Sequence, residues 1–192
     1  GRLLIMNLVI ATLPAAIVGL PTEDWIESHF FKPVPVSLAL IVGGVAILLV
    51  EKWRRRPDIE HVDHIPMKKA FGVGMIQVLA ILFPGISRSG ATIMGGMVMG
   101  LSRVAATEFS FFLAVPAMLG ASLIKLITHR EAIAVSDAPL FGVGFIVSFV
   151  VSLFVIRALL TFVSGHTFHV FAWYRILFGL ALFACWGFAG AL

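Results

Sequence analysis

The chain has 192 residues, of which 60% are hydrophobic and only 12% are charged, and its mean hydropathy is +1.05. Soluble domains carry about 25% charged residues, so this composition excludes an ordinary soluble protein and favours one integral membrane domain over residues 1–192. The formal net charge of +4 indicates basic membrane loops rather than nucleic-acid binding, because Lys and Arg collect in cytoplasmic loops. The single cysteine, Cys185, excludes an internal disulfide.

Several apolar stretches are long enough to cross a bilayer as helices, which takes about 20 residues each. The five predicted spans are residues 3–20, 34–51, 104–127, 139–163 and 169–192. The expected fold class is therefore all-α, a polytopic membrane protein. Pro116 lies inside the third span and predicts a kink there.

Two shorter apolar pieces, about 68–83 and 90–102, lie between the second and third spans and are joined by the sequence FPGISRSG. Each piece is too short to cross the bilayer comfortably, which predicts one re-entrant helical hairpin. The non-helical tip of such a hairpin must be buried in protein or line a wet cavity. The alternative is one long kinked helix, which Pro84 and Gly85 beside three hydroxyl residues and an arginine disfavour.

The basic residues predict the orientation of the spans. If residues 52–69 are cytoplasmic, ten of the fourteen Lys and Arg residues fall at or near the inner face, namely Arg2, Lys52, Arg54, Arg55, Arg56, Lys68, Lys69, Arg103, Arg157 and Arg175. Lys32, Lys125 and Arg130 then lie outside. We therefore expect the hairpin to enter from the inner side and the C-terminus to be external.

A weak internal repeat relates the second span to the last one, with Gly44 matching Gly179, 135 residues later. The two helix pairs would cross the membrane in opposite senses, as in the inverted repeats that surround midplane sites of transporters. A partner for the hairpin would then lie upstream of Gly1. The sequence therefore predicts that the chain is truncated at its N-terminus.

Arg88 stands in the middle of the hairpin segment, although an arginine near the bilayer centre costs roughly 2.5–3.5 kcal/mol on insertion scales. Its guanidinium matches phosphate oxygens two at a time. Ser87 or Ser89 can cap the helix that begins near Gly90, and a helix N-terminus attracts anions. Ser89 and Thr92 add hydroxyl donors, and Gly90 lets a ligand approach the backbone closely. The segment therefore predicts a phosphate-binding site.

The alternative interpretation is that Arg88 pairs with a buried carboxylate and that the serines only cap a helix. Glu108 is the candidate partner, because the other acidic residues cluster in loops. Glu108 could also orient Arg103 or line the path of a substrate. A structural, second-rank role for Glu108 is favoured over a catalytic one.

Other polar groups in the chain predict no chemistry. An acidic cluster after the first span is interpreted as a solvated external loop rather than as a metal site; it contains Glu23, Asp24, Trp25, Glu27 and His29. His61 and His64 lie in a polar loop without the spacing of zinc ligands. Gly96 and Gly100 form a GxxxG pattern, which is typical of close helix packing.

The run PGISRSGAT, followed by RVAATEFSFFLAVPAMLGA, resembles the second signature region of the undecaprenyl-diphosphate phosphatases, also called bacitracin-resistance proteins. The similarity continues to Tyr174 and Arg175 and covers the whole chain. The resemblance implies an inverted-repeat bundle with two re-entrant hairpins in the bacterial inner membrane. It implies hydrolysis of undecaprenyl diphosphate, which recycles the lipid carrier of peptidoglycan synthesis, and it implies bacitracin resistance.

The resemblance also implies roles for individual residues. Arg88 matches the arginine that contacts the diphosphate, and Ser87 and Ser89 match hydroxyl positions of the catalytic motif. Gly90 and Thr92 complete the implied substrate-binding set. The implied cofactor is a divalent cation, Mg²⁺ or Ca²⁺. The implied partners are a polyprenyl diphosphate and the membrane, and a homo-oligomer is compatible with the resemblance.

The chain departs from this family in one respect. An acidic signature of the form EGxTEFxPVSSTGH, which would supply the metal-binding glutamates, is absent from the 192 residues. We therefore expect no metal ligands within this sequence and no enzymatic hydrolysis by these residues alone. The alternative functions are a polyprenyl-phosphate transporter or flippase and a non-catalytic lipid-phosphate binding protein.

Overall fold

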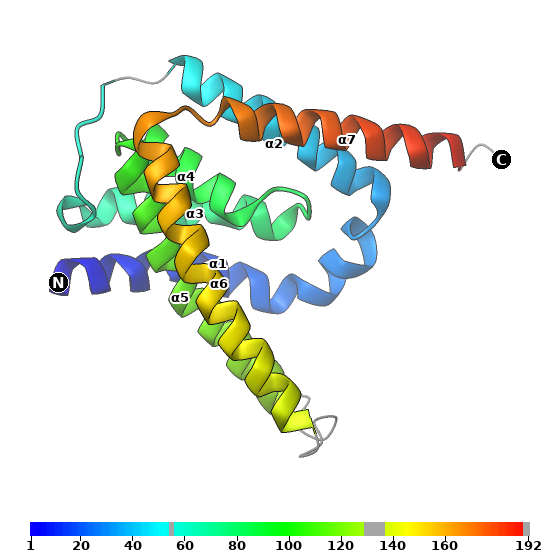
Figure 1. Ribbon diagram of the computed structural model, residues 1–192, viewed down its shortest axis with the longest axis horizontal. Coiled ribbons are helices and arrows are strands. Elements are labelled where there is room, and N and C mark those ends of the chain that lie inside the picture. The colour runs from blue at the N-terminus through cyan, green and yellow to red at the C-terminus, as the bar shows by residue number, and fades with distance from the viewer. Residues whose placement is uncertain (54–55, 129–136, 190–192) are drawn as a thin grey trace.

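The computed structural model describes residues 1–53, 56–128 and 137–189, and these residues form helices joined by short connections (Figure 1). The elements are α1 (Arg2–Phe30), α2 (Pro33–Trp53), the short 3₁₀ helix η1 (Val62–His64), α3 (Met67–Leu82), α4 (Arg88–Val98), α5 (Arg103–Thr128), α6 (Ala138–Gly165) and α7 (His169–Ala189). In the described ranges the β-structure is limited to a single bridge between Ile59 and Leu101. The predicted all-α class is confirmed.

Five helices, α1, α2, α5, α6 and α7, are each long and apolar enough to cross a membrane. They correspond to the five predicted spans. Their surfaces are covered by exposed Leu, Ile, Val and Phe side chains, most densely on α6, where Val163 is the buried residue. Such surfaces are stable in contact with lipid rather than water, so the chain is a multi-pass membrane protein.

The first helix is longer than predicted, because it continues beyond residue 20 to Phe30. The acidic cluster that was interpreted as a loop therefore lies on the last turns of α1. The predicted end at residue 20 followed hydropathy, which indicates where a helix leaves the apolar layer and not where the helix ends. Glutamate is a good helix former, so Glu23 and Glu27 allow α1 to continue. His29 Nδ1 lies 2.8 Å from the Trp25 carbonyl oxygen, one turn back along the same helix.

The hairpin consists of two separate antiparallel helices, α3 and α4, and this arrangement rules out one long kinked helix. Gly95 of α4 lies against Ile76 of α3, and Gly72 lies against Met99 at the other end of the pair. The first helix matches the prediction of residues 68–83. The second helix, predicted over 90–102, instead begins at Arg88 and ends at Val98.

Local backbone chemistry explains the earlier end of α4. Gly100 has φ +92°, a left-handed conformation that favours glycine and ends the helix. Its carbonyl accepts hydrogen bonds from the amides of Asp58 and Ile59, at 2.9 and 3.2 Å, and Ser102 N donates to Ile59 O at 2.8 Å. Gly100 therefore belongs to a loop contact that closes the base of the hairpin, and its predicted role in helix–helix packing is wrong.

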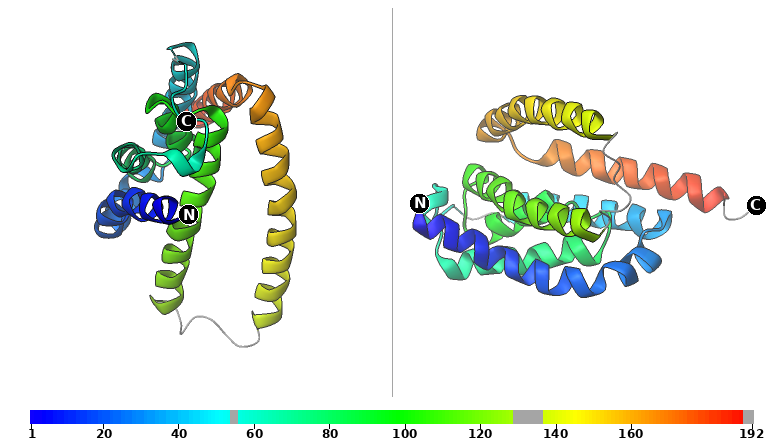
Figure 2. Two further views of the ribbon diagram at one scale, coloured as in Figure 1. Left: turned by 90° about the vertical axis from the view of Figure 1, so that its left-hand side faces the viewer. Right: turned by 90° about the horizontal axis from the view of Figure 1, so that it is seen from below.

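The helices form two packed pairs and a projecting arm (Figures 1 and 2). α1 runs parallel to α3, because Gly74 lies against Ala11 and Gly19 against Ile81. α2 and α7 lie side by side and antiparallel, and α4 lies between the two pairs. The C-terminal part of α5 and most of α6 extend away from this body, whereas the C-terminal end of α6, with the buried Val163, packs against it. The hairpin tip, Phe83–Ser87, is thereby held beside the N-terminal part of α2.

Candidate functional site

The tip of the hairpin is a tight turn that packs against α2. Gly85 has φ +102°, and a Cβ atom at this position would lie 2.6 Å from the Val36 carbonyl oxygen. Only glycine fits both the backbone conformation and this close approach. The turn therefore fixes where α4 begins relative to α2.

Ser87 caps the N-terminus of α4, as the sequence predicted for one of the two serines. Its Oγ accepts a hydrogen bond from Gly90 N at 3.1 Å and lies 3.1 Å from Ser89 Oγ. The first turn of α4 therefore presents two neighbouring hydroxyl groups beside a helix N-terminus, where the unpaired backbone N–H groups favour an anion.

The structure places Thr92 away from this end of the helix. Its side chain is 2% exposed, and its Oγ1 lies 2.6 Å from Ser110 Oγ of α5 and 3.0 Å from the Arg88 carbonyl oxygen. The Thr92 hydroxyl thus joins α4 to α5. Of the predicted substrate-binding residues, Ser87, Arg88 and Ser89 gather at the tip and Thr92 lies one turn deeper.

Arg88 is half-buried and lines a cavity of about 660 Å³ between α1, α3 and α5, which we call the Arg88 cavity. The polar residues of its wall are Thr12, Glu23, Glu27, Gln77 and Lys125. Among the described residues, no carboxylate lies within ion-pair distance of the Arg88 guanidinium. The proposed pairing of Arg88 with Glu108 is therefore not found in this structure.

Gln77 is the most deeply buried polar side chain on this cavity wall, with 1% of its surface exposed. Its Oε1 has no hydrogen-bond partner among the described residues. A buried amide oxygen without a partner costs about 1–3 kcal/mol. The sequence analysis did not single out Gln77, although a glutamine inside an apolar half-helix was a visible signal.

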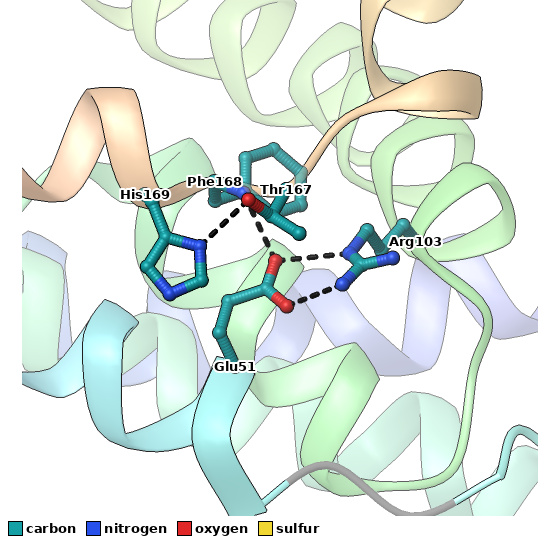
Figure 3. A network of polar contacts seen from close by, with 5 residues as sticks. All are labelled: Glu51, Arg103, Thr167, Phe168 and His169. Carbon is teal, nitrogen blue, oxygen red and sulfur yellow. Dashed lines mark hydrogen bonds and ion pairs between the residues drawn. The ribbon is translucent and has the colours of Figure 1, made fainter.

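Arg103 pairs with Glu51, and not with Glu108 (Figure 3). Arg103 Nε donates to Glu51 Oε1 at 2.9 Å, and Phe168 N donates to the same oxygen at 3.0 Å. One carboxylate therefore joins the C-terminal end of α2 to the start of α5 and to the α6–α7 connection. The adjacent Thr167 Oγ1 lies 2.6 Å from His169 Nδ1. Glu51 was missed from sequence because it looked like the polar end of a span.

Arg175 is a second arginine at the hairpin tip. The prediction placed it near the inner face, but its side chain lies opposite Gly43, in the middle of α2, and its Nη2 donates to the Gly85 carbonyl oxygen at 2.8 Å. Position along the sequence could not reveal this contact, because it requires α7 to lie against α2. Arg175 therefore contacts the hairpin tip, which the sequence analysis did not predict.

The described residues contain no group of three His, Cys, Asp or Glu side chains that could hold a metal ion. In the acidic cluster of α1, Glu23 forms an ion pair with Lys125 of α5 at 2.7 Å. The His61 and His64 rings lie edge to face, 5.8 Å apart. The donor set of the described part thus does not fit a divalent cation, which prefers several oxygen ligands.

Comparison with known proteins gives a consistent result. A family profile described as "Bacitracin resistance protein BacA" matches residues 1–181. Undecaprenyl-diphosphatase 1 of Chromobacterium violaceum is 52% identical over 185 residues, covering 96% of this chain and 68% of that protein. The undecaprenyl-diphosphatase of Pseudomonas aeruginosa is 48% identical, covering 95% of this chain and 65% of that protein.

A third relative, the undecaprenyl-diphosphatase of Nitrosospira multiformis, is 52% identical over 176 residues, covering 92% of this chain and 64% of that protein. The chain thus spans about two thirds of the length of the curated relatives it matches.

Proposed function

The chain belongs to the bacitracin resistance protein BacA family, and from this premise we propose that it serves the hydrolysis of undecaprenyl diphosphate to undecaprenyl phosphate and inorganic phosphate. The observation that carries the proposal is Arg88, a half-buried arginine without a carboxylate partner among the described residues, at the N-terminus of a short helix inside an apolar bundle. An intramembrane arginine of this kind marks a site for an anion.

Arg88 would bind the oxygens of the terminal phosphate and stabilise the negative charge that develops on them during transfer to water. Ser87 and Ser89 would donate hydrogen bonds from their hydroxyl groups at the helix N-terminus. Gly90 would admit the phosphate close to the backbone. Thr92 would act at one remove, through its bond to Ser110, by holding the first turn of α4 in place. The second-rank role of Glu108 stays a prediction.

A divalent cation, Mg²⁺ or Ca²⁺, remains part of this proposal, and it would neutralise phosphate charge when bound. The described residues offer no suitable ligand set for this cation. The bacterial inner membrane is proposed on the family membership, and an external C-terminus is proposed on the basic-residue asymmetry. The names of the relatives favour hydrolysis over transport or simple lipid binding.

Phosphate release from undecaprenyl diphosphate by purified protein in detergent, with and without Mg²⁺ or Ca²⁺, tests the proposal. The assay compares the 192-residue chain with a form that carries the acidic signature upstream of Gly1. We expect metal-dependent release by the extended form and none at an enzymatic rate by the shorter one. Release by neither form would contradict the proposed hydrolysis. Release by both would contradict only the requirement for the acidic signature.

A further inference from the structure

The helix α5 consists of two parts that differ in packing. Over residues 103–113 it packs into the body of the protein, and the buried residues of this part are Ala105, Ala106, Thr107, Phe109, Ser110 and Leu113. Over residues 114–128 no residue is buried. We call residues 116–128 the C-terminal segment of α5; it extends away from the packed helices (Figure 2). The core therefore holds the first part of α5 but not this segment.

Pro116 weakens α5 at the boundary between the two parts. Proline has no backbone N–H, so the carbonyl oxygen of Phe112 receives no helical hydrogen bond from position 116. Sharp bends of long helices concentrate at such positions. The hydrogen-bond ladder is thus interrupted just after packing against the core ends. The C-terminal segment can change its angle there without disturbing the core.

The C-terminal segment forms one wall of the Arg88 cavity. Its lining residues are Pro116, Ala117, Gly120, Ala121, Ile124 and Lys125, and α1 supplies much of the remaining wall. A Cβ atom at Gly120 would meet no atom of the described residues within 4 Å. Open space therefore lies beside the segment, and a change in its angle would widen or narrow the cavity that Arg88 lines.

An exposed ion pair joins the C-terminal segment to α1. Lys125 Nζ lies 2.7 Å from Glu23 Oε1, and both residues line the Arg88 cavity. Lys125 stands about 13 Å beyond Pro116 along α5. The two side chains are 59% and 49% exposed, and an exposed ion pair shifts an equilibrium only about two- to fivefold. This ion pair can therefore break and form again readily.

The other end of α5 is held by a stronger contact. Arg103 makes a two-pronged bond to Glu51, whose side chain is 1% exposed. Separating a buried ion pair costs far more free energy than separating an exposed one. The start of α5 is therefore fixed and its end is held weakly, with Pro116 between them.

We propose that the C-terminal segment of α5 is a gate of the Arg88 cavity, which turns about Pro116 and is closed by the Glu23–Lys125 ion pair. A phosphate ion in the cavity opens the gate, because its oxygens compete with the Glu23 carboxylate for the Lys125 ammonium group. The identification of this ion as the product of hydrolysis rests on the proposed function. The hinge and the ion pair do not rest on it, because the movement requires no reaction.

Distances between two spin labels test the gate in the 192-residue chain that carries Cys185→Ser. The labels are placed at Ile17→Cys on α1 and Ile127→Cys on the C-terminal segment, at exposed positions that do not line the cavity. We expect a shorter and a longer distance, and Glu23→Gln should raise the ratio of longer to shorter about two- to fivefold. Asp24→Asn removes the neighbouring charge, which does not line the cavity, and should leave the ratio unchanged. An unchanged ratio in Glu23→Gln would overturn the gate.

A second pair of labels separates a movement of the segment from a movement of the whole helix. The distance between Ile17→Cys and Phe112→Cys, on the other side of the proline, should not respond to Glu23→Gln. A response as large as that at position 127 would overturn the hinge.

Pro116→Ala tests the hinge directly, because it restores the missing N–H to the helix. With labels at positions 17 and 127, this variant should lose one of the two distances. The control Val115→Ala changes an exposed neighbour and keeps the proline, so both distances should remain. Two distances in Pro116→Ala, in the same ratio as in Val115→Ala, would show that the proline is not the hinge.

Inorganic phosphate tests what opens the gate. It should raise the ratio of longer to shorter distance more than sodium chloride of the same ionic strength does, because screening acts in both solutions alike. Lys125→Gln should abolish this difference between the two salts. Farnesyl phosphate carries the same group on an apolar chain, and an effect of farnesyl phosphate alone would assign the opening to a lipid head group and overturn the role of the free ion. All these measurements are independent of hydrolysis, so a rigid α5 would overturn the gate and leave the proposed function standing.

Discussion

Glu51 on α2 and Arg103 on α5 form a two-pronged ion pair in which the Glu51 side chain is 1% exposed. Arg103 Nη2 lies 2.5 Å from Oε2, and the second carboxylate oxygen is shared between Arg103 and the backbone of Phe168. Three segments that are distant in sequence therefore meet on one buried charge. The ion pair fixes α5 relative to α2. Because Glu51 binds Arg103, it does not neutralise Arg88, whose charge stays available to a ligand in the Arg88 cavity.

The first prediction concerns this ion pair. Glu51→Ala should destabilise the protein by about 3 kcal/mol, because Arg103 and the Phe168 amide would both lose their acceptor in a buried position. Unfolding in mixed detergent, followed by circular dichroism, measures the effect. The exposed Glu60→Ala change should cost little. Equal stability of the two variants would contradict a structural role of the pair.

A second prediction concerns Arg88. In a form that carries the acidic signature upstream of Gly1, Arg88→Lys should lose most of the phosphate-releasing activity although the positive charge is kept, because an ammonium group cannot make the two-pronged contact. A loss of at least about tenfold in kcat/KM is expected. Arg157→Lys serves as the control on the exposed surface of α6. Near-normal turnover by Arg88→Lys would remove Arg88 from the phosphate site.

A third prediction concerns Gln77, whose buried Oε1 has no partner among the described residues. Gln77→Met keeps an unbranched side chain of similar length and removes the amide, so the stability of the protein should rise by about 1 kcal/mol. If the amide is instead held for a ligand of the Arg88 cavity, the same variant should also weaken binding of that ligand. Thermal unfolding and titration with inorganic phosphate measure the two effects. A loss of stability would show that Gln77 has a partner in the folded protein.

A fourth prediction concerns the contact between α2 and α7. A Cβ atom at Gly44 would lie 2.6 Å from Ile176 and 2.8 Å from the Ala172 carbonyl oxygen. A Cβ atom at Gly179 would lie 2.8 Å from both Ile41 and the Ser37 carbonyl oxygen. The repeat offset of 135 residues converts one set of contacts into the other, so the two helices meet through a local twofold relationship.

Gly44→Ala and Gly179→Ala should therefore destabilise the protein by similar amounts, about 1–3 kcal/mol each. Gly142 has open space around it, so Gly142→Ala on α6 should be neutral or stabilising. Thermal unfolding of the three variants measures this comparison. A large difference in stability between Gly44→Ala and Gly179→Ala would show that the two symmetry-related contacts do not contribute equally to stability.

A fifth prediction concerns topology. Cysteines placed singly at residues 57–63, in a protein with Cys185→Ser, should be labelled from the cytoplasmic side, and cysteines at 131–137 from outside. Residues 131–136 lie outside the described ranges, so their position follows from the basic-residue asymmetry alone. The reverse labelling pattern would invert the orientation and the side from which the hairpin enters.

By itself, the sequence determined the class of the fold and the centre of the site. Spans are visible because about 20 successive apolar residues are needed to cross a bilayer, and this signal is local. The hairpin tip is visible because Pro84, Gly85 and the serines around Arg88 are each tied to backbone conformations of their immediate neighbours. The end of α1 was placed wrongly for the same reason, since local hydropathy reports lipid contact and not helix length.

Only the tertiary structure decided which charges meet. Glu51 and Arg103 are 52 residues apart, and Arg175 and Gly85 are 90 residues apart, so no periodicity links them. Arg103 forms an ion pair with a carboxylate, whereas Arg88 and Arg175 each line a cavity. The packing of α2 against α7 and of α1 against α3 determines which groups lie near each arginine. An arginine in an apolar sequence indicates a functional site. The helices packed around the arginine determine whether its partner is a side chain or a ligand.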